Sequence, residues 1–409
     1  MNWLVVIAGL VFVVFVHELG HFWVALAVRM RPRSFYIGFP PALVKVRRKG
    51  IEYGIGMIPL GGLVRIPGMH RPATRDLRAN LEPAEREQPS LAAALGAVRR
   101  ALEAEDYDAA RLAYPELEQA VGAAHLSPAA RSSAERALRD VEEGTAPDAY
   151  WRAPTWKRVA VIAAGPLANI FLAFAILFVV FAVSGAPSGK PTAEVAQVEA
   201  GTPAAAAGLR AGDRIVAVNG VPTRSFGEAS HLIRGSHGRP VTLTVRRDRR
   251  RVAVGPRPTV LRDGRWIFGF APTERVVGQS TGKAARTAAS DLWGVVTGTA
   301  AGLRGLVSHQ GRSQLSGPVG IVRVEHSQLQ VGATWYLQIL AFVSMSLALV
   351  NLLPLLPLDG GHILFSLIEG VRRRALAREV YERVSVVGIA FILLIMVIAF
   401  SNDLSGHPH

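Results

Sequence analysis

The chain has 409 residues, of which 50% are hydrophobic and 19% are charged, and its formal net charge is +15. So high an apolar fraction is unusual for a soluble protein of this length, and we expect a membrane protein. The basic residues lie beside the apolar runs, so the expected partner is the lipid bilayer with its anionic headgroups and not nucleic acid. The chain has no cysteine, which excludes disulfides and thiolate metal ligands.

Four apolar runs approach or exceed the roughly 20 residues that a helix needs to cross a bilayer. They predict transmembrane helices at residues 1–29, 156–184, 334–362 and 383–401. Arginine and lysine are concentrated after the first run and between the third and fourth runs. The positive-inside rule therefore predicts that these two connections are cytoplasmic, and that both termini and residues 184–334 are extracytoplasmic.

The first connection, residues 30–155, contains two distinct parts. Residues 50–68 alternate apolar with small or polar residues and are interrupted by Gly61-Gly62, which predicts a bent, membrane-associated β-hairpin. Residues 77–143 are rich in Ala, Glu and Arg at helical spacing and contain Pro89, Pro115 and Pro128. This pattern predicts a helical insert of two or three short amphipathic helices, which we interpret as a solvated structural extension.

Residues 191–272 alternate β-rich stretches with Gly and Pro turns. Within them, Gly201–Gly220 predicts a short helix ending at Gly208, a strand at Arg214–Val218 and a turn at Asn219-Gly220. This segment resembles the bacterial PDZ domains of proteases, and an unrelated small β-rich domain is the alternative. We therefore expect an extracytoplasmic, PDZ-like α+β domain, followed by a connecting amphipathic segment at residues 273–333.

The first apolar run contains His17-Glu18-Leu19-Gly20-His21, an H-E-x-x-H motif. On a helix the two imidazoles project from one face and can bind one metal ion, while Glu18 lies beside them to accept the proton of a water molecule. Zn²⁺ suits two imidazoles with one carboxylate. Because a charged side chain in a transmembrane helix costs about 2.5–3.5 kcal/mol, a functional cluster is favoured over a packing role that Ser or Asn would serve.

A third metal ligand is expected from another apolar segment at similar depth. The end of the third run, Asn351–His362, contains Pro354 and Pro357, which interrupt a helix. Irregular backbone in a membrane is tolerated where it lines a cavity or packs within protein. Asp359 supplies a carboxylate in this segment, and His362 is the rival ligand.

Six segments resemble motifs of the site-2 protease family of intramembrane metalloproteases, in family order and over most of the chain. The resemblance is to the bacterial regulators of envelope stress that carry one PDZ domain. The segments are His17–His21, Pro59–Gly62, Ala164–Asn169, the PDZ-like segment, Ser316–Gly320 and Leu358–His362. Two features depart from better-known members, namely the single PDZ-like domain and a proline, Pro357, placed one residue later. The helical insert has no match in the family pattern.

The resemblance implies a fold and a function. The fold is a polytopic α-helical membrane protein with four transmembrane helices, the membrane-associated hairpin and the inserted PDZ-like domain. The function is regulated intramembrane proteolysis by a zinc metalloendopeptidase, with Zn²⁺ on His17, His21 and Asp359 and with Glu18 as catalytic base. The residues implied to contact substrate are Asn351, Ile55, Met57, Gly61 and Gly62.

The implied substrates are single-pass membrane proteins already cut once, such as anti-sigma factors or remnant signal peptides. The implied location is the bacterial inner membrane, with the active site toward the cytoplasm. A catalytically inactive PDZ membrane adaptor and a metal transporter are the alternatives, and the intact H-E-x-x-H motif disfavours the adaptor. For Asn169, binding of a freed substrate backbone group and helix packing are both left open, and the sequence does not determine the oligomeric state.

Overall fold

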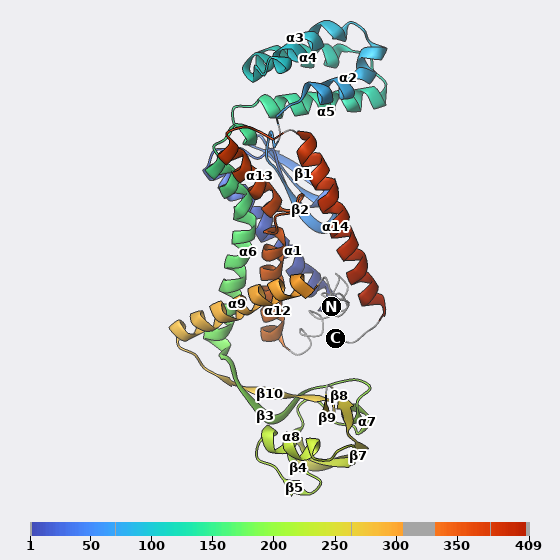
Figure 1. The fold of residues 1–409 in the computed structure, drawn as a ribbon, viewed down its shortest axis with the longest axis vertical. Helices are drawn as coiled ribbons and strands as arrows, with labels where there is room; N and C mark the ends of the chain where they lie inside the picture. The colour runs from blue at the N-terminus through green and yellow to red at the C-terminus, as the bar shows by residue number, and fades with distance from the viewer. Residues whose placement is uncertain (1, 70, 263, 306–331, 377, 406–409) are drawn as a thin grey trace. The chain divides into compact units, whose positions relative to one another are not determined.

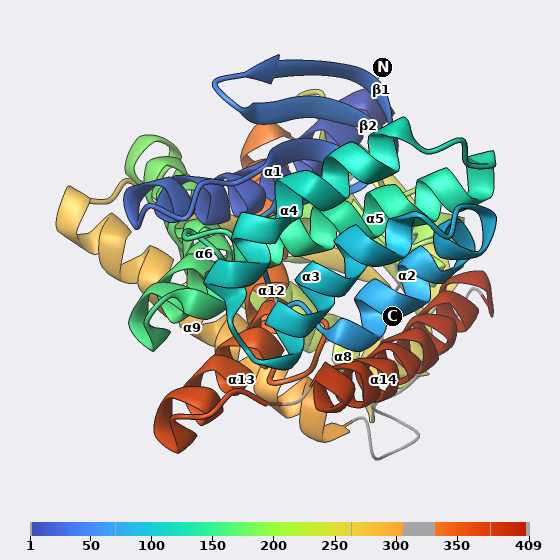
Figure 2. The same cartoon turned by 90° about the horizontal axis from the view of Figure 1, so that it is seen from above.

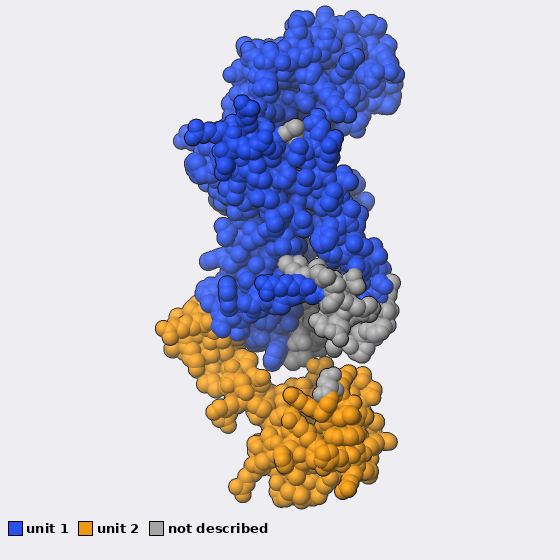
Figure 3. All heavy atoms as spheres, viewed as in Figure 1, with its two compact units in different colours: residues 1–177, 289–409 blue, residues 178–288 orange. Residues whose placement is uncertain are grey.

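The computed structural model describes residues 2–69, 71–262, 264–305, 332–376 and 378–405. The chain forms two compact units, which Figure 3 shows in different colours: residues 1–177 with 289–409, and residues 178–288. Of the predicted connecting segment 273–333, helix α9 (Thr281–Gly305) is described. The Ser316–Gly320 motif lies outside the described residues.

Among the described residues, four helices are long and apolar enough to cross a membrane. They are α1 (Asn2–Ala27), α6 (Thr155–Ser184), α12 (Ala333–Asn351) and α14 (Arg378–Ser405), and all four are labelled in Figure 1. Val6 and Val13 of α1 pack with Tyr336 of α12 and with Leu172 of α6 in one buried cluster. Many large apolar side chains on the four helices stay exposed, as lipid-facing residues are expected to be.

The third apolar run is not one helix, so the predicted span 334–362 is wrong at its carboxyl end. Helix α12 ends at Asn351, an irregular segment follows, and α13 begins at Asp359 and ends at Arg372. Pro354 and Pro357 lie in this segment and have no N–H group to continue a helix. A Cβ on Gly360 or Gly361 would collide with the backbone of the irregular segment, so these glycines let α13 start directly against it.

Helix α13 is fastened to α6 by a buried ion pair. Arg158 Nη1 donates to Glu369 Oε2 at 2.6 Å, and both side chains are about 10% exposed or less. The Tyr150 hydroxyl lies 3.0 Å from Ser366 Oγ one turn earlier in α13. Because an ion pair with good geometry at a buried position tolerates little displacement, these contacts fix α13, and with it Asp359, relative to α6.

The predicted hairpin at residues 50–68 has a different construction. Residues Ile51–Arg65 form one bent strand, β2, whose partner β1 is Ser34–Arg48, upstream of the predicted region. The first residues of β1 pair with both ends of β2: Ile37 lies opposite Ile55 and also opposite Gly62. The bend includes Gly61, whose φ of +130° disfavours any residue with a side chain.

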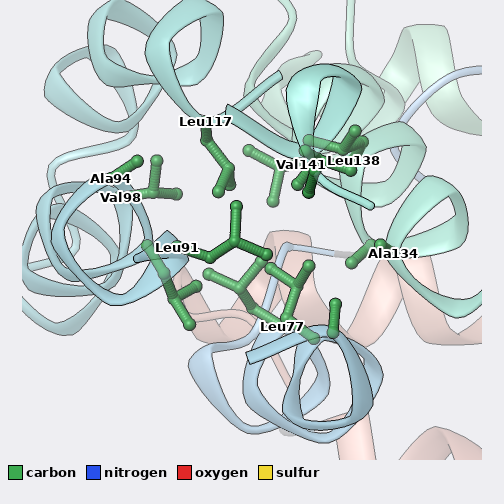
Figure 4. Packing of buried hydrophobic residues seen from close by; sticks show 14 of the residues in the cluster. Leu77, Leu91, Ala94, Val98, Leu117, Ala134, Leu138 and Val141 are labelled. Carbon is green, nitrogen blue, oxygen red and sulfur yellow. The ribbon is translucent and has the colours of Figure 1, made fainter. Parts of the chain in front are cut away.

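The insert forms four helices and not the predicted two or three. They are α2 (Thr74–Glu87), α3 (Leu91–Glu103), α4 (Tyr107–Ala123) and α5 (Pro128–Thr145). Figure 4 shows their shared core, which includes Leu77, Leu91, Leu117 and Val141. Pro115 lies inside α4 without ending it, since packing of the apolar face outweighs the lost hydrogen bond.

The two ends of the insert meet at a narrow neck. The backbone N–H groups of Tyr150 and Trp151 donate to the carbonyls of Pro67 and Gly68 at 2.9 and 3.1 Å. Arg65 at the end of β2 pairs with Glu143 of α5 at 2.9 Å. Figure 2, in which the four insert helices lie toward the viewer, shows α2 beside α5 and α3 beside α4.

The second unit is built on a six-stranded sheet in the order β10-β3-β4-β6-β7, with β5 paired to β4. The strands are β3 (Ala186–Val198), β4 (Arg214–Val218), β5 (Val221–Pro222), β6 (Pro240–Arg247), β7 (Arg250–Pro258) and β10 (Phe270–Val277). Strands β8 (Val260–Arg262) and β9 (Arg265–Ile267) form a separate pair, and the helices are α7 (Pro203–Ala206) and α8 (Phe226–Arg234). The sheet therefore extends beyond the expected bounds of 191–272.

Asp213 lies just before β4 and is only 1% exposed. Its carboxylate accepts from Arg247 Nε at 2.7 Å, from Arg247 Nη2 at 2.6 Å and from the Arg210 backbone N–H at 2.9 Å. Burial opposes ionisation, but these hydrogen bonds outweigh it and hold the pKa of Asp213 below its usual range. The ionised carboxylate therefore ties the loop before β4 to β6.

We predict that Asp213→Asn weakens this unit at neutral pH, by about 2 kcal/mol, because Arg247 loses a charged partner. Since the folded pKa is lowered, the stabilisation is present above the unfolded pKa of about 4 and is lost as the pH falls through the folded value. Hydrogen-exchange protection of β4 and β6 in the full-length protein measures the difference.

Glu199→Gln is the matched control, because it removes an exposed pair with Arg262 (side chains 43% and 50% exposed) and should change protection little. Equal protection of Asp213→Asn and wild-type protein at pH 7 would contradict the assigned role of Asp213.

Candidate metal centre

The side chains of His17, His21 and Asp359 bring three potential metal ligand atoms together. His17 Nε2 lies 3.2 Å from His21 Nε2 and 3.1 Å from Asp359 Oδ2, and His21 Nε2 lies 3.4 Å from the same oxygen. The histidines are one turn apart on α1, and the aspartate is the first residue of α13. Around a tetrahedral zinc ion, ligand atoms lie about 3.3 Å apart, so the spacing fits such an ion.

The protonation pattern of these atoms also fits a cation. His21 Nδ1 lies 2.8 Å from the carbonyl oxygen of Val161, which can only accept, so Nδ1 carries the proton and Nε2 of the neutral ring has a lone pair. Asp359 Oδ2 is buried and has no hydrogen-bond partner among the described residues. A cation between this buried carboxylate oxygen and the lone pair of His21 Nε2 would stabilise both groups, and the N-terminus of α13 also favours the negative charge of the carboxylate.

Glu18 lies next to this cluster and close to β2. Val64 of β2 lines the same cavity as Glu18. A Cβ on Gly62 would collide with the Glu18 side chain, so the glycine leaves the space that the carboxylate occupies. A carboxylate fixed beside a metal cluster without belonging to it is placed to accept a proton from a water molecule there.

A cavity of about 560 Å³ joins the cluster to the other predicted residues. Its lining includes Asn351, Gly61 and Gly62 together with the three potential ligands and Glu18. Ile55 and Met57, also predicted to contact substrate, do not line it; their side chains are 53% and 55% exposed elsewhere on the hairpin. His362, the rival ligand, lines the cavity but lies outside the group of converging ligand atoms.

Helix α6 contributes contacts that sequence reasoning did not identify. A Cβ on Gly165 would collide with the His21 ring, and one on Gly20 would collide with the backbone of Ala164. Val161, Gly165 and Asn169 follow one another at four-residue intervals, so they share one face of α6. This four-residue spacing could have indicated in the sequence that α6 packs against the two histidines, because it matches the interval between them on α1.

Comparison with known proteins identifies a metalloprotease family, in agreement with the potential metal ligands described above. The family model described as Peptidase family M50 matches residues 5–395. The chain is 31% identical to the regulator of sigma-W protease RasP of Bacillus subtilis, over 96% of this chain and 95% of that protein. It is 30% identical to a provisionally named zinc metalloprotease of Mesorhizobium japonicum and 28% identical to zinc metalloprotease RasP of Bacillus licheniformis, in both cases over 96% of each chain.

We predict that Gly165→Ala lowers zinc affinity at least tenfold, because the added methyl displaces the His21 imidazole. Alanine favours a helix more than glycine does, so weakening of α6 itself is not expected. Zinc-to-protein ratios of purified protein after dialysis against a graded chelator series measure the effect.

Gly294→Ala in α9 is the matched helical control, because a Cβ there meets no described atom within 4 Å. Zinc content of Gly165→Ala equal to that of the control would show that α6 does not shape the His21 position.

Proposed function

Because the chain belongs to peptidase family M50, the site-2 protease family, and is a zinc metalloprotease, we propose that it hydrolyses peptide bonds within the membrane-spanning segments of other proteins. The observation that carries this proposal is the convergence of His17, His21 and Asp359 between apolar helices. A metal centre among helices that can span a membrane is suited to substrates within the bilayer.

In this proposal His17, His21 and Asp359 hold Zn²⁺. When bound, zinc supplies a Lewis acid that polarises the scissile carbonyl and makes water a nucleophile at neutral pH. Glu18 accepts the proton of the attacking water and delivers it to the leaving nitrogen. Gly62 leaves room for the Glu18 side chain, and both residues line the cavity.

The substrate's membrane helix has to unwind before a carbonyl becomes accessible, since each carbonyl is hydrogen-bonded within that helix. We propose that the segment Gly62–Arg65 of β2 pairs with the unwound chain. Its residues line the cavity, and β1 pairs with it along one edge. Strand addition supplies the lost backbone hydrogen bonds, and Asn351, at the end of α12, provides a further polar group in the same cavity.

We propose that the protein lies in a bacterial inner membrane with its active site toward the cytoplasm. The basic residues after α1 and between α13 and α14 support this orientation. The proposed substrates are single-pass membrane proteins that were cut once before, such as anti-sigma factors or remnant signal peptides. The name of the Bacillus subtilis relative, a regulator of sigma-W, favours the anti-sigma factor class.

The second unit is proposed to be an extracytoplasmic PDZ-like domain that selects substrates. Its strand Arg214–Val218, the turn at Asn219-Gly220 with positive φ at both residues, and helix α8 support this assignment. The domain either excludes bulky uncut proteins or recruits trimmed ones. A steric filter needs no sequence match with the substrate, so exclusion is the form that we propose.

We predict that Glu18→Gln retains zinc and reduces proteolysis of a model transmembrane substrate at least a hundredfold, because the amide cannot accept the water's proton. Purified protein in detergent is tested for cleavage by gel and for zinc by elemental analysis. His17→Ala serves as the comparison and should lose both zinc and activity. Cleavage by Glu18→Gln near the wild-type rate would reject the proposed base.

We predict that replacing Pro187–Val276 with a short Gly/Ser linker lets an uncut substrate be cleaved in the membrane. The deletion is geometrically simple, since Ala186 and Val277 are opposite each other in the sheet. Cleavage of full-length and trimmed versions of one substrate is compared in cells. If trimmed substrate is cleaved less and uncut substrate stays intact, the domain recruits and does not exclude.

A further inference from the structure

Asn169 of α6 is a polar residue in the membrane-spanning part of the protein that the proposed mechanism does not use. It is fully buried, with 0% exposure, and it does not line the cavity. Its Nδ2 lies 3.5 Å from His17 Nδ1, and its Oδ1 has no hydrogen-bond partner within the described part of the chain. Leaving a buried amide oxygen unpaired costs about 1–3 kcal/mol, so the residue calls for an explanation.

The ring of His17 explains the unpaired amide oxygen of Asn169. Its Nε2 points to Asp359 and His21, so a metal bound there takes the lone pair of Nε2. A neutral imidazole with a lone pair on Nε2 carries its proton on Nδ1, and that N–H needs an acceptor. Asn169 is the residue beside Nδ1. A half-turn of its amide about the Cβ–Cγ bond exchanges oxygen and nitrogen and places the oxygen toward Nδ1.

His21 already shows the same arrangement. Its Nδ1 donates to the carbonyl oxygen of Val161 at 2.8 Å. Val161 and Asn169 lie two turns apart on one face of α6, so one helix faces the outer nitrogens of both histidines. Gly165, midway between them, gives the His21 ring its space.

We propose that Asn169 is a positioning residue of the zinc site: its side-chain oxygen accepts the hydrogen of His17 Nδ1 and holds the Nε2 lone pair toward the metal. The inference rests on the proposed assignment of His17 as a ligand. Such partners of ligating histidines fix the tautomer and the ring orientation, and their loss costs about 10–100-fold in metal affinity.

Two other roles for Asn169 agree less well with its surroundings. Binding of substrate requires access, and the side chain has none. Helix packing by hydrogen bonding is satisfied through the main chain, because Ser344 Oγ of α12 donates to the Asn169 carbonyl at 3.0 Å. Neither role explains why the side-chain amide lies next to His17.

The test measures zinc affinity of purified full-length variants by chelator competition. Asn169→Leu, similar in size but without an acceptor, should bind zinc 10–100-fold more weakly. Asn169→Asp keeps an acceptor oxygen, because an ionised carboxylate can only accept hydrogen bonds. Its zinc affinity should stay within a few-fold of the wild-type value. Ser344→Ala removes the hydrogen bond from α12 to the main-chain carbonyl of Asn169 and leaves the Asn169 side chain unchanged. This variant should keep the wild-type zinc affinity.

Cobalt-substituted protein gives a second readout, since its visible d–d absorption reports the geometry of the ligands and not stability. The spectrum of Asn169→Leu should differ from that of wild type, and that of Asn169→Asp should resemble wild type. If Asn169→Leu keeps wild-type affinity, or if Asn169→Asp loses it, the proposal is overturned. The aspartate variant decides alone if the leucine variant does not fold.

His17→Ala separates this inference from the proposed function. If His17→Ala keeps wild-type zinc affinity, His17 is not a ligand and both proposals fail. If His17→Ala loses zinc while Asn169→Leu binds normally, the metal assignment stands and the role of Asn169 alone is rejected.

Discussion

The buried polar cluster around His17, His21 and Asp359 sets the constraint to which the neighbouring elements conform. Each of its polar atoms lies among apolar helices, where a group without a partner is costly. Helix α6 approaches α1 closely through Gly20 and Gly165 and supplies a carbonyl to His21. Strand β2 approaches through a glycine, which leaves room for the adjacent carboxylate. Small residues and backbone groups, more than bulky apolar side chains, thus build the centre.

The third potential ligand belongs to a different helix, so its place depends on contacts some distance away. Asp359 begins α13, and the Arg158–Glu369 pair near the other end of that helix joins it to α6. The irregular segment before Asp359 packs under Gly360 and Gly361, and Gly388 of α14 lies against the carbonyl of Leu356. Removing one partner of a buried ion pair leaves an uncompensated charge, so α13 has few alternative positions.

The sequence was sufficient for features with strong local signals. The length of the apolar runs predicted the four long helices, except for the carboxyl end of the third span. Helical periodicity was enough for the H-E-x-x-H motif to place two imidazoles together. The sequence was insufficient where distant segments meet. Strand β1 contains Pro40-Pro41, which is unusual in a strand, and its pairing with β2 is set by tertiary contacts. Ile55 and Met57 lie on the same strand as cavity residues, but they are exposed away from the cavity. The residues alone left Asp359 and His362 open as the third ligand, and the resemblance implied Asp359. In the structure Asp359, and not His362, belongs to the group of converging ligand atoms.

The neck at Pro67-Gly68 and Tyr150-Trp151 makes the helical insert structurally self-contained. Two backbone hydrogen bonds close the chain there, and the four helices beyond it bury their own apolar core. A segment with its own core and adjoining ends can be gained, lengthened or lost during evolution while the membrane helices keep their register. A change in the length of the insert would therefore leave the packing around the metal centre intact.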